Sequence, residues 1–99
     1  MKVVADEWMS LDGVIQSPSG PGEDPSGDFP HGGWHMRYFE PVSQQWVLDG
    51  LHAATAFLYG RRTYEAFAAH WPHAGPDEQV VAEPINTKPR YVASRTLTD

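Results

Sequence analysis

The sequence predicts an α/β fold in which helices cover both faces of a mostly parallel sheet, giving three α/β/α layers. Two observations lead to this class. Short apolar runs typical of buried strands alternate along the chain with stretches of helical periodicity. The order strand, loop, helix, strand, helix, short helix, strand then implies right-handed crossovers between parallel strands.

The first segments are a strand and a long loop. Residues 2–9 contain Val3 and Val4 and read as a strand, and the Asp12-Gly13 pair that follows indicates a turn or bulge. Residues 17–33 hold most of the Pro and Gly, so we expect a mobile loop without regular structure. A loop of this length in a compact domain is often a functional lid.

A helix and a strand are expected next. From Ser43 to Ala54, three apolar residues share one helical face, and Ser43 is a suitable N-cap for that helix. The apolar residues 55–59 then predict a buried strand. Helix 61–71 follows and should be stopped by Pro72, which cannot continue a helix.

The last elements are a short helix at 77–85, broken near Pro84, and a strand at 90–94. Parallel strands so few in number leave bare edges, which can pair with a second copy of the chain. We therefore expect a single domain over residues 1–99 that is truncated and able to form a homodimer. The aromatic residues expected in the core are Trp46, Phe57, Phe67 and Trp71.

Composition excludes several classes of function. The 99 residues carry a formal net charge of −6, which argues against general nucleic-acid binding. Because there is no cysteine, disulfides and thiolate catalysis are excluded. No apolar run approaches the roughly 20 residues of a membrane span. With no signal peptide either, we expect a cytoplasmic protein that does not bind membranes.

The segment from Tyr59 to Glu65 is the most informative for function. Gly60 lies between a predicted strand and a predicted helix, where a ligand can approach the backbone closely. The first N–H groups of the helix lack partners and attract anions. Arg61, Arg62 and Thr63 add further donors, which favours phosphate binding. The alternative is a solvent-facing arginine pair at a helix start.

Four segments together resemble the dihydrofolate-reductase-like family. They are Met9 to Ile15, Gly32-Gly33-Trp34, Gly60 to Glu65, and Pro89 to Leu97. The closest branch is the C-terminal reductase domain of the bifunctional riboflavin-biosynthesis deaminase–reductase. The resemblance covers nearly the whole chain, yet members of this branch are longer. Their second half supplies further strands, a second glycine-rich turn and part of the substrate wall.

The resemblance implies an NADPH-dependent reductase acting on a small pteridine-like or pyrimidine-like heterocycle. In this family the turn matching Gly60, Arg61, Arg62 and Thr63 holds the cofactor pyrophosphate and the region of the 2′-phosphate. The residues matching Ser94 and Arg95 lie beside the 2′-phosphate. Arg95 at the end of the third strand favours NADP, whereas an Asp or Glu after the second strand would favour NAD. Nicotinamide contacts are implied for Ser10, Asp12 and Gly13.

Other residues have a structural and a functional interpretation. Asp12 is the one acid in a recognisable pocket motif and is the candidate catalytic residue, or else a turn residue beside Gly13. Trp34 and Tyr38 are candidates for stacking on the substrate, or else packing aromatics. His70 and His73 have the spacing of a metal-binding pair, but Pro72 breaks the helical geometry, so we expect no metal.

The leading hypothesis is a reductase acting on 5-amino-6-(5-phosphoribosylamino)uracil or a related heterocycle. The alternative is a non-catalytic nucleotide-binding or assembly module. A true dihydrofolate reductase is less well supported, because that branch places a carboxylate on the first helix facing the pterin. Here the clear acid on that helix, Asp49, lies near its far end.

Overall fold

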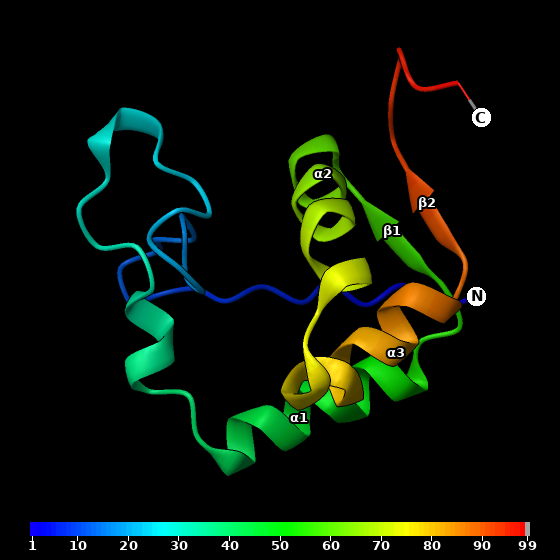
Figure 1. Cartoon of the computed structure of the whole chain (residues 1–99), viewed down its shortest axis with the longest axis horizontal. Helices are drawn as coiled ribbons and strands as arrows, with labels where there is room; N and C mark the ends of the chain where they lie inside the picture. The colour runs from blue at the N-terminus through cyan, green and yellow to red at the C-terminus, as the bar shows by residue number, and fades with distance from the viewer. Residues whose placement is uncertain (99) are drawn as a thin grey trace. The chain divides into compact units, whose positions relative to one another are not determined.

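A computed structural model of the chain describes residues 1–98, and Figure 1 shows its path. The chain divides into two compact units, Met1–Glu40 and Pro41–Asp99. The second unit contains the α-helices and the strands, in the order α1, β1, α2, α3, β2. The two units are described separately below.

A parallel pair of strands forms the sheet of the second unit (Figure 1). Strand β1, Phe57–Tyr59, pairs with β2, Arg90–Val92, in a register that places Tyr59 beside Val92. Ala93 N also donates to Tyr59 O across 3.1 Å, which extends the pairing beyond β2. The expected α/β class with a parallel sheet is therefore confirmed, and two of the three predicted strands, 55–59 and 90–94, are present in shortened form.

The expected strand at residues 2–9 does not form: residues 1–9 have no regular secondary structure. A strand is stable only when its N–H and C=O groups pair with a neighbouring strand. Within residues 1–98 the sheet consists of β1 and β2 alone, and residues 2–9 join neither. The prediction of a strand there was wrong, because an apolar pattern forms no strand without a paired neighbour.

Helix α1 spans Pro41–Ala53 and begins earlier than predicted. Ser43 is therefore inside the helix and is not its N-cap, because Pro41 supplies a favourable first helical residue that needs no N–H partner. The far end is held by Lys88, whose Nζ donates to Leu51 O at 2.6 Å and Ala54 O at 2.6 Å, and to His52 O at 3.0 Å. These carbonyls have no partner within the helix itself.

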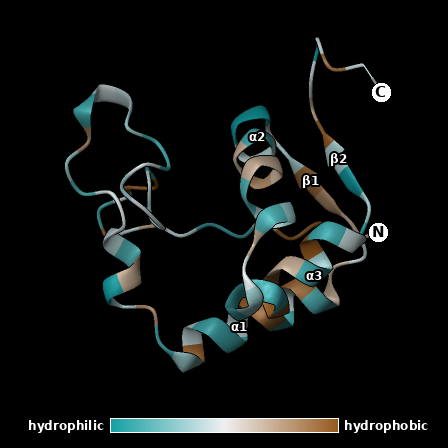
Figure 2. Cartoon of the chain, in the orientation of Figure 1, coloured by the Kyte–Doolittle hydropathy of each residue, from teal (hydrophilic) through white to brown (hydrophobic). Residues whose placement is uncertain are grey.

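Helix α2 spans Arg61–His70 and follows β1 directly. Its first turn is hydrophilic and comes immediately after the hydrophobic β1 (Figure 2). The aromatic ring of Phe67 packs edge-on against Tyr59 of β1 with ring centroids 5.2 Å apart. Pro72 does end the α-helix as predicted, although the chain continues as the 3₁₀ helix η3, Trp71–His73.

The short helix expected at 77–85 forms as the 3₁₀ helix η4, Pro76–Glu78, followed by α3, Gln79–Thr87. The predicted break near Pro84 was wrong, since Pro84 lies inside α3. Pro84 and Ala82 are fully buried, and Ile85 is buried with 3% exposure. Burial of this face against neighbouring helices, including α1 and η3, offsets the backbone hydrogen bond that a proline removes.

The core is smaller than the aromatic content suggests. Phe57, Phe67 and Trp71 are half-buried, in partial agreement with the prediction. Trp46 was wrongly assigned to the core and is 64% exposed. The face of α1 that is partly buried carries Val47, Leu48 and Leu51, and Trp46 lies beside that face.

The first unit is built around a hydrogen-bonded loop. Ser17 is buried; its Oγ donates to Gly20 O at 2.9 Å and accepts from Asp24 N at 2.8 Å. The side-chain amide of Gln16 donates to the carbonyls of Asp24 and Ser26. The loop includes a 3₁₀ helix, η1, Ser26–Asp28, so the expectation of no regular structure was wrong in that segment. A second 3₁₀ helix, η2, spans Trp34–Arg37.

Candidate functional site

The predicted phosphate-binding residues lie at the start of α2. Gly60 precedes the helix in an extended conformation, with φ −76° and ψ 169°, and no side chain caps the helix there. The first backbone N–H groups of a helix lack internal partners and carry partial positive charge. A Cβ placed on Gly60 would meet no atom within 4 Å. Neither backbone strain nor packing requires glycine here, and the space beside the helix start is open.

A cavity of about 180 Å³ lies beside this helix start. The cavity lies between the first turns of α2 on one side and, on the other, the end of β2 with the segment that follows β2. Two of the predicted cofactor-binding residues, Arg61 and Ser94, line it together. The complete lining is Arg61, Tyr64, Glu65, Val92, Ser94, Thr96 and Leu97.

Arg61 is held in place by a residue one helical turn further on. Its Nε donates to Glu65 Oε1 at 2.9 Å, and the two side chains are 70% and 60% exposed. An arginine has five N–H donors. The bond to Glu65 engages one of them, so the other donors of the guanidinium can bind an anion. The cavity therefore contains one cationic and one anionic side chain.

Ser94 shapes the turn after β2. Its Oγ accepts hydrogen bonds from Thr96 N at 3.1 Å and Leu97 N at 2.9 Å. A hydroxyl has two acceptor sites and one donor hydrogen. With both acceptor sites engaged by the backbone, the hydroxyl hydrogen of Ser94 is the group suited to donate to an anion in the cavity.

The remaining predicted phosphate contacts lie close in sequence but do not line this cavity. Gly60, Arg62 and Thr63 belong to the same helix start, and Arg95 follows Ser94. Tyr64 and Glu65 do line the cavity and were not predicted. The spacing could have identified them, because residues three and four positions after Arg61 lie on the same helical face.

Ser10, Asp12 and Gly13 form one tight turn in the first unit. Ser10 Oγ donates to Asp12 Oδ1 at 2.6 Å and accepts from Val14 N at 2.8 Å. Gly13 has a φ of +92°, which disfavours any residue with a side chain. The Ser10 hydrogen bond, together with one from the Asp12 backbone, lowers the pKa of Asp12. The turn thus holds Asp12 as an exposed carboxylate, and its catalytic role stays a prediction.

The predicted stacking residues differ in their surroundings. The indole Nε1 of Trp34 donates to Gln16 O at 3.0 Å and so fastens the end of the loop. Tyr38 is 76% exposed. A third aromatic group nearby is His35, whose ring stacks on Trp8 with centroids 4.1 Å apart. Substrate stacking by Trp34 and Tyr38 stays a prediction.

Of the two histidines considered for metal binding, His70 contacts a carboxylate. His70 Nε2 lies 3.0 Å from Glu78 Oε2, which links the end of α2 to η4. Among residues 1–98, no three His, Asp or Glu side chains cluster in a way that could hold a metal ion. None of the helices in this same stretch is both long enough and apolar enough to cross a membrane.

Comparison with known proteins identifies the family of the chain. A family model described as the RibD C-terminal domain matches residues 1–99. No curated protein matches the chain at a significant level. The match includes both the α2 start and the segment after β2, whose residues line the cavity described above.

Proposed function

Because the chain belongs to the RibD C-terminal domain family, a reductase-type domain of riboflavin biosynthesis, we propose that it binds NADPH for reduction of a small heterocycle. The preferred substrate is 5-amino-6-(5-phosphoribosylamino)uracil or a close relative. The cofactor phosphate contacts are assigned to the cavity that Arg61 and Ser94 share.

One observation carries this proposal. Arg61 follows β1 and Ser94 follows β2, and the parallel pairing of these strands brings both residues to one cavity. The carboxyl ends of parallel strands are the usual ligand-binding edge of an open α/β sheet. A guanidinium, a hydroxyl hydrogen and helix-start N–H groups form a set of donors suited to a phosphate.

The donors and the open space fit the phosphates of NADPH. Arg61 and Ser94 would hold a phosphate, and Gly60 would admit it close to the first N–H groups of α2. Arg62, Thr63 and Arg95 extend the donor set along the same two segments. When bound, the cofactor supplies the hydride. The chain's own part is to bind and orient, and we assign Ser10, Asp12 and Gly13 to the nicotinamide and Trp34 and Tyr38 to the heterocycle.

The test is a comparison of two cofactors. NADPH and NADH are titrated into the wild-type chain and into Arg61→Ala, Arg62→Ala, Ser94→Ala and Arg95→Ala, with Arg37→Ala as an arginine control outside the cavity. Loss of a charge-assisted hydrogen bond should weaken NADPH binding by about tenfold or more. The residue that contacts the 2′-phosphate should affect NADPH and leave NADH nearly unchanged.

Two outcomes would count against this proposal. If no variant separates NADPH from NADH, the phosphate assignment is wrong. Turnover is tested separately by adding the uracil substrate and measuring the loss of NADPH absorbance as the cofactor is oxidised. Tight NADPH binding without any turnover would favour a non-catalytic nucleotide-binding module instead.

A further inference from the structure

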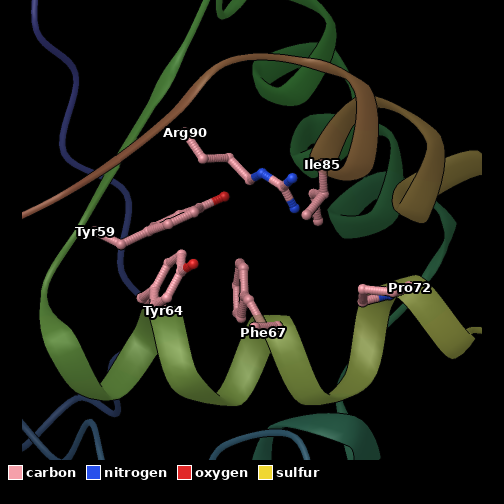
Figure 3. Close-up of a pocket in the computed structure, with 7 residues that line it drawn as sticks. Tyr59, Tyr64, Phe67, Pro72, Ile85 and Arg90 are labelled. Atoms are coloured by element: carbon pink, nitrogen blue, oxygen red, sulfur yellow. The ribbon is translucent and has the colours of Figure 1, made fainter. Parts of the chain in front are cut away.

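A second cavity, of about 330 Å³, lies in the Pro41–Asp99 unit. Its walls come from β1, α2, η3, α3 and β2, and Tyr64 is the one residue it shares with the smaller cavity. In Figure 3 the side chains of Tyr59, Tyr64, Phe67 and Arg90 point toward one another across this space. The full lining is Tyr59, Tyr64, Phe67, Ala68, Pro72, Ile85 and Arg90.

One end of this cavity is polar and incompletely hydrogen-bonded. The hydroxyl of Tyr59 is buried and has no hydrogen-bond partner within residues 1–98. A buried hydroxyl without a partner is unfavourable, so a ligand acceptor placed there would remove that cost. Burial raises the pKa of Tyr59, and Arg90 lowers it less strongly. The hydroxyl is therefore protonated at neutral pH and able to donate.

The same end of the cavity is cationic. Arg90 begins β2, and its guanidinium reaches toward the hydroxyl of Tyr59 and toward Ile85 (Figure 3). In the described part of the chain no carboxylate forms an ion pair with Arg90. A donor hydroxyl beside a cation selects an acceptor that carries negative charge.

The other walls are mainly apolar, and Tyr64 adds a hydroxyl to them. Phe67 packs edge-on against Tyr59 at 5.2 Å and against Trp71 at 6.0 Å, which fixes its ring. Ile85 is 3% exposed and Pro72 lies opposite Arg90 in Figure 3. Such walls favour a compact ring, because aromatic groups gain both buried area and edge-to-face contacts there.

We propose that this cavity is a binding site for a small aromatic carboxylate. The carboxylate accepts hydrogen bonds from the Tyr59 hydroxyl and the Arg90 guanidinium, and the ring packs against Phe67, Pro72 and Ile85. A carboxylate suits the site, because its two oxygens can accept from the two donors, Tyr59 and Arg90, while the ring lies against the apolar residues. The site is separate from the phosphate contacts of Arg61 and Ser94.

The test uses benzoate as the probe and the isoleucine methyl groups as the reporter. The sequence contains Ile15 and Ile85 alone of this type, and only Ile85 lines the cavity. In the intact chain with labelled isoleucine methyl groups, added benzoate should shift the Ile85 signal and leave Ile15 in place. Benzyl alcohol, which has the ring without the charge, should bind at least about tenfold more weakly, about 1.4 kcal/mol.

Matched variants then identify the polar contacts. Tyr59→Phe keeps the ring and removes the hydroxyl, and Arg90→Gln removes the charge. Each should weaken benzoate binding by about tenfold, while Arg37→Gln, outside the cavity, should not. Equal binding of benzyl alcohol and benzoate, or no shift of Ile85, would overturn the proposal even if a variant fails to fold. NADPH titration of the same samples reports on the phosphate site independently.

Discussion

Arg61 Nε donates a hydrogen bond to Glu65 Oε1 across 2.9 Å, and both side chains line the cavity that also contains Ser94. Glu65 therefore acts on a bound phosphate in two opposing ways. It orients Arg61, which favours binding, and it brings a negative charge to the same cavity, which opposes binding. The relative size of these two effects on phosphate affinity can be measured.

We predict that Glu65→Gln strengthens NADPH binding at low salt. An exposed ion pair of this spacing contributes only about 0.3–0.5 kcal/mol, and glutamine can still accept from Arg61. Removal of the negative charge should therefore outweigh the loss of the ion pair. The affinity for NADPH should rise about twofold to fivefold at low ionic strength. Glu83→Gln, on an exposed position of α3, is the control for net charge. Weaker binding by Glu65→Gln would show that orientation of Arg61 dominates.

The second prediction separates cofactor binding from stability at Gly60. Serine is a preferred N-cap, and Gly60 has an extended conformation that serine can adopt without meeting another atom. Gly60→Ser should therefore keep or slightly raise the melting temperature. The added side chain should still weaken NADPH binding by about tenfold, because it occupies the open space beside the helix start. Unchanged affinity in a calorimetric titration would mean that no phosphate approaches Gly60.

The third prediction concerns Lys88, whose ammonium group holds the carbonyls at the end of α1. Lys88→Met keeps most of the side-chain length but removes all three hydrogen bonds. Partly buried carbonyls left without a donor should cost about 1–3 kcal/mol in the free energy of unfolding. Urea unfolding followed by circular dichroism measures this, with Lys2→Met as the control. Equal unfolding midpoints for the two variants would contradict the structural role of Lys88.

The fourth prediction tests the turn at Ser10. The hydrogen bond from Ser10 lowers the pKa of Asp12, so Ser10→Ala should raise that pKa toward its ordinary value. Because the folded-state pKa is the lower one, this carboxylate stabilises the fold above its unfolded pKa. That contribution is lost as pH falls through the folded pKa. A carboxyl-carbon NMR titration reads the change directly, and Ser10→Thr, which retains the hydroxyl, should keep the pKa low.

The fifth prediction concerns order in the loop over residues 17–33. A Cβ on Gly32 would lie 2.4 Å from Pro21 Cα, so Gly32→Ala must push these backbone segments apart. Amide exchange in the loop should become faster by about tenfold or more. Gly22→Ala is the control, since a Cβ at Gly22 meets nothing within 4 Å. Exchange that is equally fast in the wild-type chain and in both variants would support the mobile lid expected from the sequence.

The sequence alone determined the features that depend on local spacing. The helical faces, the turn at Gly60 and the strand propensity around Phe57 and Tyr91 were all readable because they repeat over a few residues. The family resemblance rested on the same kind of signal and is confirmed by the match over residues 1–99. Helix boundaries were less certain, as Pro41 and Pro84 show, because a proline's effect depends on where in the helix it lies.

Tertiary structure alone decided which distant residues meet. Arg61 and Ser94 share a cavity because β1 and β2 pair in a register that places Tyr59 beside Val92, and this register does not follow from composition. The same dependence explains why residues 2–9 form no strand despite their apolar pattern. The backbone hydrogen bonds of a strand are made to residues far along the chain, whereas a helix makes most of its backbone hydrogen bonds within its own segment.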